Sequence, residues 1–180
     1  MNVFPPIEHD AVTWLQNYIK PSMIAFEYGS GDSTIYFNKF VKSLVSIEHI
    51  AEKFYVLKDK IHKSNFNYEL IPPIKDPKPF PYSHLSYGST DSDYLHYSFK
   101  NYVNHINNYP DRLFDIVLIN GRSRASCIMT TIPKIKRGGI LILNDSERYV
   151  YQDAQKLFLK TQTVVCFAGS NRKTSIYEIK

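Results

Sequence analysis

Short apolar runs alternate with amphipathic helical patterns along this chain, and this alternation constrains the fold more than any other feature. It is typical of βαβ units, in which parallel strands are joined by helices that cover the sheet. The expected strands are residues 23–28, 44–47, 68–71, 114–119 and 140–143. We therefore predict an α/β fold with a mostly parallel sheet, and the chain length predicts a single domain over residues 1–180.

Six helices are expected between and after these strands, at residues 10–19, 32–40, 50–61, 95–106, 125–135 and 147–160. We expect Asp10 to cap the first helix and Gly138 and Gly139 to end the fifth.

The C-terminal part of the chain predicts a different kind of strand pairing. Two β-rich runs, residues 163–167 and 174–179, flank the turn residues Gly169, Ser170 and Asn171, which indicates an antiparallel hairpin. A segment with five prolines, residues 72–81, is expected to form a stiff surface loop and is the candidate lid.

Composition and cysteine spacing exclude several classes of protein. Cys127 and Cys166 stand far apart, which argues against a zinc cluster, a redox pair or a disulfide framework. No run approaches the roughly 18 apolar residues that a membrane span needs, and charged residues follow the short apolar start, so we predict a cytoplasmic protein without a signal peptide. The net charge of +5 is spread along the chain, which favours a solvated basic surface over a nucleic-acid partner.

A glycine loop follows the first expected strand, at residues 27–34 with the sequence EYGSGDST. In an open α/β sheet, ligands bind beyond the carboxyl ends of the strands, so this loop is expected to face a ligand. Gly29 and Gly31 permit close backbone approach, and the following helix offers its N-terminal amides. Glu48, at the end of the next strand, can accept hydrogen bonds from both ribose hydroxyls of a nucleoside.

The same layout could hold NAD or S-adenosylmethionine (SAM). The dinucleotide fingerprint needs a third glycine, whose place is taken by Thr34. The acid at Glu27 fits a cofactor with a cationic amino-acid end better than one with a pyrophosphate. The sequence therefore favours SAM.

Residues 26–34, 45–49 and 114–124 resemble the glucuronoxylan 4-O-methyltransferase group and related small microbial sugar O-methyltransferases, and residues 138–148 resemble the fifth-strand motif of the microbial relatives. The resemblance implies a single-domain, Rossmann-like class I methyltransferase fold with a mostly parallel seven-stranded sheet, whose last two strands form the antiparallel hairpin. It also implies SAM as cofactor and S-adenosylhomocysteine as product.

Together, the loop motif and the resemblance imply a set of cofactor-binding residues: Glu27, Tyr28, Gly29, Ser30, Gly31, Ser33, Thr34, Glu48, His49, Asn120 and Gly121. By position, the glycine loop would face the methionine end and Glu48 the ribose. The region around Tyr87 would approach the adenine.

The chain departs from its relatives where a base or metal would act. They carry aspartate at the position of Asn120, and Asn144 replaces the first acid after the fifth strand. An amide is neither a general base nor a good ligand for a divalent metal, so no metal site is predicted. Asp145 is the first candidate for the catalytic base, with a helix N-cap as its alternative role. His49 is the second candidate, and its alternative role is packing.

Arg122, Arg124 and Tyr87 are the predicted substrate-binding residues, because two arginines at the site could fork onto the carboxylate of an acidic sugar. Helix-start packing or a salt bridge with Asp145 or Glu147 is the alternative for the arginines. The resulting hypothesis is an O-methyltransferase that acts on a carbohydrate hydroxyl. A methyltransferase for nucleic acids or small molecules, and a SAM-binding domain without catalysis, remain as alternatives, and a homo-oligomer is left open.

Overall fold

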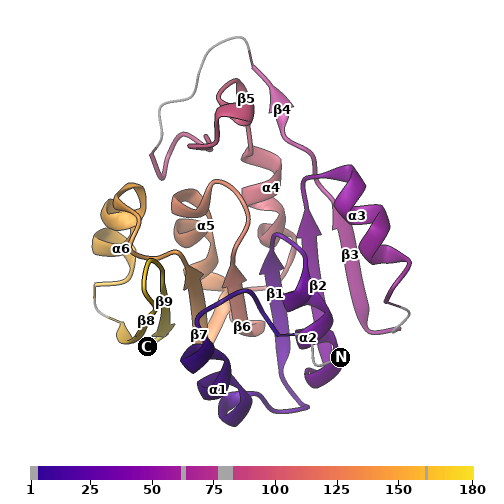
Figure 1. Cartoon of the computed structure of the whole chain (residues 1–180), viewed down its shortest axis with the longest axis vertical. Coiled ribbons are helices and arrows are strands. Elements are labelled where there is room, and N and C mark those ends of the chain that lie inside the picture. The colour runs from indigo at the N-terminus through magenta and orange to yellow at the C-terminus, as the bar shows by residue number, and fades with distance from the viewer. Residues whose placement is uncertain (1–3, 62–63, 77–82, 161) are drawn as a thin grey trace.

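The computed structural model describes residues 4–61, 64–76, 83–160 and 162–180. Its main sheet has the strand order β3-β2-β1-β6-β7-β9-β8, from β3 at the right to β8 at the left of Figure 1. The seven strands are β1 (Ile24–Tyr28), β2 (Ser43–Glu48), β3 (Phe66–Leu70), β6 (Phe114–Ile119), β7 (Ile135–Asn144), β8 (Thr163–Ala168) and β9 (Lys173–Glu178). The first five strands of this order, β3, β2, β1, β6 and β7, run parallel to one another, and β9 is antiparallel to both β7 and β8. The predicted parallel sheet and its C-terminal hairpin are therefore confirmed.

The described residues form six α-helices, which are α1 (His9–Tyr18), α2 (Asp32–Phe40), α3 (Ala51–Lys58), α4 (Lys100–Asn104), α5 (Arg124–Thr131) and α6 (Gln152–Phe158). Four short 3₁₀ helices cover Ser92–Tyr94, His105–Asn108, Ile132–Lys134 and Tyr149–Tyr151. A separate two-stranded antiparallel sheet joins β4 (Ile74–Lys75) to β5 (Tyr97–Ser98).

Apolar side chains cover both faces of the sheet, because its parallel strands are apolar on both sides. On one face, Phe26 and Val117 pack with residues of α4, α5 and α6. On the other, Ala25 and Ile116 pack with residues of α1 and α2. The two clusters make a three-layer structure that fixes the strand ends, where the glycine loop and Glu48 lie.

The chain reverses direction across the sheet beside β1. It runs outward from β1 to β2 and β3, then crosses back to place β6 on the other side of β1. Ligand sites of open α/β sheets lie at such a switch point, outside the carboxyl ends of the strands. The loops after β1, β2 and β6 are therefore the place to look for a site.

Three helix predictions need correction at their ends. The N-cap position of α1 is Glu8, without a side-chain cap, and Asp10 lies in the first turn. The third helix ends at Lys58, before Ile61. The predicted helix over 95–106 is α-helical only in α4, and Leu95 is 45% exposed. The apolar residues Leu95 and Phe99 precede α4, and Ile106 lies in the 3₁₀ helix that follows it, so the regular spacing does not mark one continuous helix.

The fifth strand starts earlier than predicted, and the last helix starts later. β7 begins at Ile135, so Gly138 and Gly139 lie inside a strand rather than after a helix. A register shift opposite Phe114 and Ile116 gives the strand its irregularity, and Gly138 accommodates it with a φ of +76°. Asp145 is not an N-cap, because the 3₁₀ turn that precedes α6 starts after Arg148.

Part of the proline segment lies within the described residues. There β4 pairs with β5, so residues 74–75 are not the loop that the prolines predict. Residues 77–81 lie outside the described part of the chain, and so does the lid prediction that rests on them. In the described ranges, no helix has the length and apolarity needed to cross a membrane.

Candidate active site

The loop after β1 and the loop after β6 pack against each other through two glycines. Gly29 has a φ of +86°, and a Cβ there would lie 2.6 Å from the Cα of Gly121. A Cβ on Gly121 would in turn lie 1.9 Å from the hydroxyl oxygen of Tyr102. Only glycines fit at both positions, which brings the two backbones together at the end of β1.

Glu27 stabilises the glycine loop through buried hydrogen bonds and does not line the pocket. Its carboxylate is fully buried and accepts hydrogen bonds from Ser33 Oγ, Thr34 Oγ1 (2.5 Å) and Ser46 Oγ (2.6 Å). Thr34 Oγ1 also accepts from the amide of Gly31, at 2.9 Å. Burial raises the pKa of Glu27 to about 7, although the hydroxyl donors oppose the shift. Glu27, Ser33 and Thr34, which are predicted to bind the cofactor, thus fix the shape of the loop through these bonds.

Tyr28 is also part of the core rather than the pocket. Its ring is fully buried, and its hydroxyl donates to the carbonyl of Val103 at 2.8 Å. Its contribution to the site is its carbonyl oxygen, which accepts from the amide of Asn120 at 3.0 Å and joins the ends of β1 and β6.

Glu48 lies at the end of β2 and accepts four hydrogen bonds. Oε1 accepts from the amides of His49 (2.7 Å) and Ile50 (3.0 Å), and Oε2 accepts from the amide (3.1 Å) and hydroxyl (2.9 Å) of Ser30. Burial alone would raise the pKa of Glu48, but the nearby imidazole of His49 and these donors outweigh it and lower the pKa to about 2. The carboxylate is thus ionised at neutral pH.

A pocket of about 250 Å³ opens at this point, between the ends of β1, β2 and β6. Its lining includes predicted cofactor residues from all three loops, namely Gly29, Ser30, Glu48, His49, Asn120 and Gly121. Arg122, a predicted substrate residue, lines it as well. The structure therefore brings together Gly29 and Gly121, which are 92 positions apart in the sequence.

Three further residues line the pocket that the sequence analysis did not single out: Pro6, Ile50 and Lys53. Lys53 belongs to the first turn of α3 and follows Ile50 by three positions, a spacing that places both on one helix face. This spacing was the available signal for Lys53. Pro6 reaches the site from the N-terminal segment, which no local pattern predicts.

His49 is buried among aromatic rings at the pocket wall. It is 8% exposed and makes edge-on contacts with Tyr94, Phe99 and Tyr102. Nδ1 lies 2.8 Å from Oε1 of Glu48 but lacks the alignment of a hydrogen bond, so neither ring nitrogen has a hydrogen-bond partner among the described residues. The predicted packing role and a ligand contact are both compatible with this position.

The two predicted substrate arginines differ in how they are held. Arg122 forms an ion pair with Asp91 at 2.5 Å, and its guanidinium lies 5.6 Å from the ring centroid of Tyr94. Its Nε is buried without a hydrogen-bond partner in the described part of the chain. Arg122 therefore joins the loop after β6 to the segment before α4 at the mouth of the pocket.

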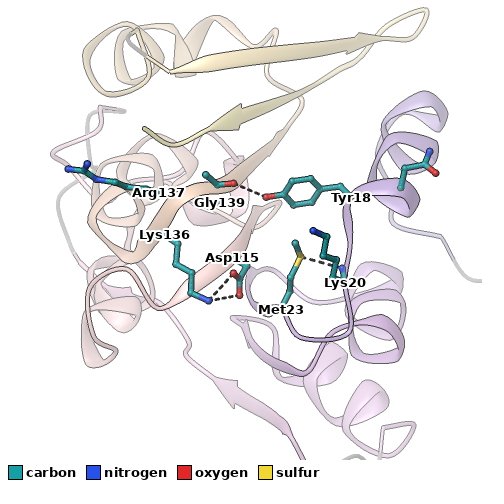
Figure 2. Close-up of a pocket in the computed structure, with 9 residues that line it drawn as sticks. Tyr18, Lys20, Met23, Asp115, Lys136, Arg137 and Gly139 are labelled. Atoms are coloured by element: carbon teal, nitrogen blue, oxygen red, sulfur yellow. Dashed lines mark hydrogen bonds and ion pairs between the residues drawn. The ribbon is translucent and has the colours of Figure 1, made fainter.

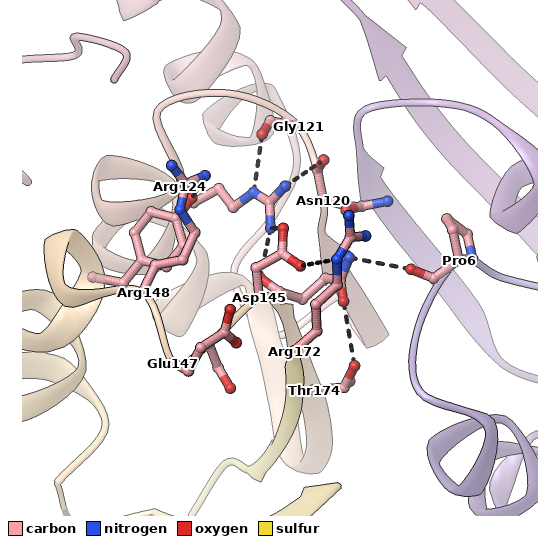
Figure 3. Close-up of polar contacts among 12 residues, drawn as sticks. Pro6, Asn120, Gly121, Arg124, Asp145, Glu147, Arg148, Arg172 and Thr174 are labelled. Atoms are coloured by element: carbon pink, nitrogen blue, oxygen red, sulfur yellow. Dashed lines mark hydrogen bonds and ion pairs between the residues drawn. The ribbon is translucent and has the colours of Figure 1, made fainter. Parts of the chain in front are cut away.

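Arg124 is used inside the protein, as Figure 3 shows. It is 7% exposed, and its guanidinium donates to the carbonyl oxygens of Gly121, Asn144 and Asn120 and to Asp145 Oδ2 at 3.2 Å. Because all three guanidinium nitrogens donate to protein groups, the structure favours the alternative, helix-start packing with a salt bridge to Asp145, over the predicted contact with a substrate carboxylate.

Asp145 follows β7 and has a φ of +52°. Its Oδ2 pairs with Arg124, whereas its buried Oδ1 has no hydrogen-bond partner among the described residues and lies 3.9 Å from Arg172 Nε. Asp145 does not line the 250 Å³ pocket, but it adjoins Asn144, whose side chain contacts Asn120 in the pocket wall.

Tyr87 lies away from this pocket. It has a φ of +57°, packs partly buried against the core, and accepts a hydrogen bond from the amide of Phe99 at 2.8 Å. No group of three or more metal-ligating His, Cys, Asp or Glu side chains occurs in the described ranges.

A second pocket, about 390 Å³, lies near the amino ends of β1 and β6 (Figure 2). Its acid, Asp115, is used structurally: it accepts from the amide of Ile24 at 2.8 Å and pairs with Lys136 at 2.8 Å. Tyr18 donates to the carbonyl of Gly138 at 2.9 Å. These bonds tie three strands together, and the pocket lies at the edge opposite to the strand ends where ligands of this fold bind.

Comparison with known proteins shows which fold this is. A methyltransferase-like protein from Silicibacter pomeroyi matches with a TM-score of 0.65 and 20% identity over 100% of this chain and 89% of its own. A proposed methyltransferase from Streptococcus mutans, in complex with SAH, matches with a TM-score of 0.58 and 12% identity over 89% of this chain and 91% of its own. Precorrin-6y C5,15-methyltransferase from Geobacter metallireducens matches with a TM-score of 0.58 and 16% identity over 94% of this chain and 86% of its own. The chain has the class I methyltransferase fold. No family model and no curated protein matches its sequence.

Proposed function

We propose that this protein is a SAM-dependent O-methyltransferase that acts on a hydroxyl of a carbohydrate acceptor. The observation that carries the proposal is the convergence of the glycine loop, Glu48 and the Asn120–Gly121 turn on one pocket at the switch point of the sheet. The fold neighbours, one of them with SAH bound, support the same cofactor.

The pocket residues fit the nucleoside part of SAM. Glu48 stays ionised, and one of its oxygens is shared with Ser30 Oγ. That hydroxyl also contacts the hydroxyl of Tyr68 at 2.6 Å, so it can release Glu48 to a ribose hydroxyl without losing every partner. The close packing of Gly29 against Gly121 brings their two loops to one pocket, where we expect the methionine end to bind.

SAM supplies an electrophilic methyl group on its sulfonium, so the protein needs to position an acceptor hydroxyl and take up its proton. We propose that Asp145 takes up this proton. Its Oδ2 is held by Arg124, and its Oδ1 is buried without a hydrogen-bond partner among the described residues, so Asp145 would have to turn toward the pocket to reach an acceptor hydroxyl. His49 is the second candidate. Its ring lies beside Glu48, the residue that we propose to hold the ribose.

Charge at the pocket mouth supports an acidic acceptor. Lys53 and Arg122 both line the pocket, and of the two only Arg122 has an acidic partner, Asp91, among the described residues. The side chain of Arg122 is 32% exposed, so its guanidinium can be reached from the pocket mouth. A uronic acid or another acidic sugar would meet both cations.

A SAM-binding domain without turnover is the second candidate. The observation that favours it is the hydrogen bond between Asn120 and Asn144, because amides stand where relatives carry acids.

The experiment that tests both functions is incubation of the purified protein with methyl-labelled SAM and a panel of neutral and acidic sugars, free and nucleotide-linked, with oligonucleotides and small phenols as controls. Label in an acidic sugar supports the proposal. Label in a control acceptor contradicts the carbohydrate assignment, and cofactor binding without transfer to any acceptor supports the second candidate.

A further inference from the structure

Strand β8 forms one edge of the main sheet and is its most exposed strand. Within the described part of the chain it pairs only with β9, and the other side of its backbone has no strand partner there. Five of its six residues are exposed and the sixth, Phe167, is intermediate. Val164 is 50% and Val165 is 40% exposed, although valine prefers the inside of a sheet.

Both faces of this edge are apolar. Val164 is opposite Tyr177 on β9 and Val165 is opposite Ile176, so the two valines lie on opposite faces of the sheet. A strand that pairs with β8 would cover backbone hydrogen-bonding groups and apolar side chains on both faces at once.

Edge strands of monomeric proteins are normally protected by charges, prolines or bulges. The other edge of this sheet, β3, carries Glu69, which is bonded to Asn67 and to His105. By contrast, residues 162–171 contain no charged residue and no proline, in a chain with 22% charged residues. The β8 edge lacks these protective features.

We propose that β8 pairs with β8 of a second copy of this chain, antiparallel about a twofold axis at Val165. A second copy fits because the surface is self-complementary and uncharged, whereas the net charge of +5 would make two copies repel at most other faces. Centring the pairing at Val165 keeps it within β8, because Thr163 of one copy is then opposite Phe167 of the other and the two Val165 side chains meet on one face. The dimer would join the two sheets into one continuous sheet.

This inference does not depend on the proposed function, and sedimentation equilibrium over a dilution series tests it. The wild-type protein is expected to show twice the chain mass of 21.0 kDa. Val165→Lys places two ammonium groups opposite each other and is expected to give the monomer mass with an unchanged far-ultraviolet circular dichroism spectrum. Val56→Lys is the matched control, because Val56 is 54% exposed on α3, and it should remain dimeric.

Cross-linking checks the register. With Val165 at the twofold axis, strand spacing and rise put the two Cys166 Cα atoms about 8 Å apart. Cys127 is buried and Cys166 is exposed, so a short bis-maleimide should join two chains through Cys166, and Cys166→Ser should abolish the product. A monomer mass for the wild type, a dimer that survives Val165→Lys, or a dimer that does not cross-link would each overturn the proposal.

Discussion

The side-chain amide of Asn144 donates a hydrogen bond to the side-chain oxygen of Asn120, 2.9 Å away, across the carboxyl ends of β7 and β6. Asn144 also donates to the carbonyl of Pro6 at 3.1 Å and accepts from Thr174 at 3.3 Å (Figure 3). Two carboxylates at this separation would repel unless one were protonated or a cation lay between them. The amide pair therefore lets two neighbouring strand ends approach without a metal ion.

This relationship predicts the outcome of a double-mutant cycle. Asn120→Asp keeps an oxygen that can accept from Asn144, so it should cost less than about 1 kcal/mol in the free energy of unfolding. Asn120→Asp combined with Asn144→Asp should cost about 2 kcal/mol more than the sum of the single changes. Urea unfolding at pH 7 measures the cycle. Additive effects would show that the two side chains do not interact.

The raised pKa of Glu27 predicts that the stability of the folded protein depends on pH. Its pKa is raised by burial to about 7 in the folded protein, from the ordinary 4.5, so its contribution is fully present below pH 4.5 and is lost as the pH rises through about 7. The loss should be on the order of 3 kcal/mol. Glu27→Gln, which stays neutral, should not show it. Unfolding of both proteins between pH 4.5 and 8 gives the difference, and parallel curves would refute the assignment.

The close contact between Gly121 and Tyr102 predicts that a substitution at Tyr102 restores stability lost by a substitution at Gly121. Gly121→Ala puts a methyl group 1.9 Å from the Tyr102 hydroxyl, which should cost about 1–3 kcal/mol by overpacking. Adding Tyr102→Phe removes an oxygen that has no hydrogen-bond partner among the described residues, so the double variant should recover part of that loss. Thermal unfolding of the three variants tests this, and a double variant less stable than Gly121→Ala would be inconsistent with the packing.

Asp145→Asn is predicted to lower kcat about 100-fold or more, because a general base typically contributes that much, while the Kd for SAH stays unchanged. Asp153→Asn, an exposed acid on α6, is the control and should retain full activity. His49→Gln tests the second base candidate in the same assay. Full turnover by Asp145→Asn with loss in His49→Gln would transfer the role to His49.

Much of the fold was predictable because it depends on local patterns. The strand over residues 114–119 was predicted with the bounds that β6 has, since five of its six residues are apolar and buried, as is typical of a strand that is covered on both faces. The start of β7 was not predictable, because a bulge opposite Phe114 and Ile116 lets Gly138 and Gly139 stay inside the strand.

For the candidate site, sequence order placed Glu48 and Gly29 correctly at neighbouring strand ends, and both line the pocket. It could not tell that Arg124 turns inward while Arg122 faces the pocket mouth. That difference arises from the carbonyl oxygens of Asn120 and Asn144, which only the folded chain brings to the same guanidinium.

The most direct test of the central claim is isothermal titration of the wild-type protein and of Glu48→Gln with SAH, with Glu52→Gln, an exposed acid on α3, as the control. One binding site per chain is predicted for the wild type and the control. Loss of the charged acceptor should weaken the affinity of Glu48→Gln about tenfold to a hundredfold, the equivalent of about 1.5–3 kcal/mol. Absence of SAH binding by the wild type, or equal affinity in Glu48→Gln, would contradict the claim that this pocket holds the cofactor.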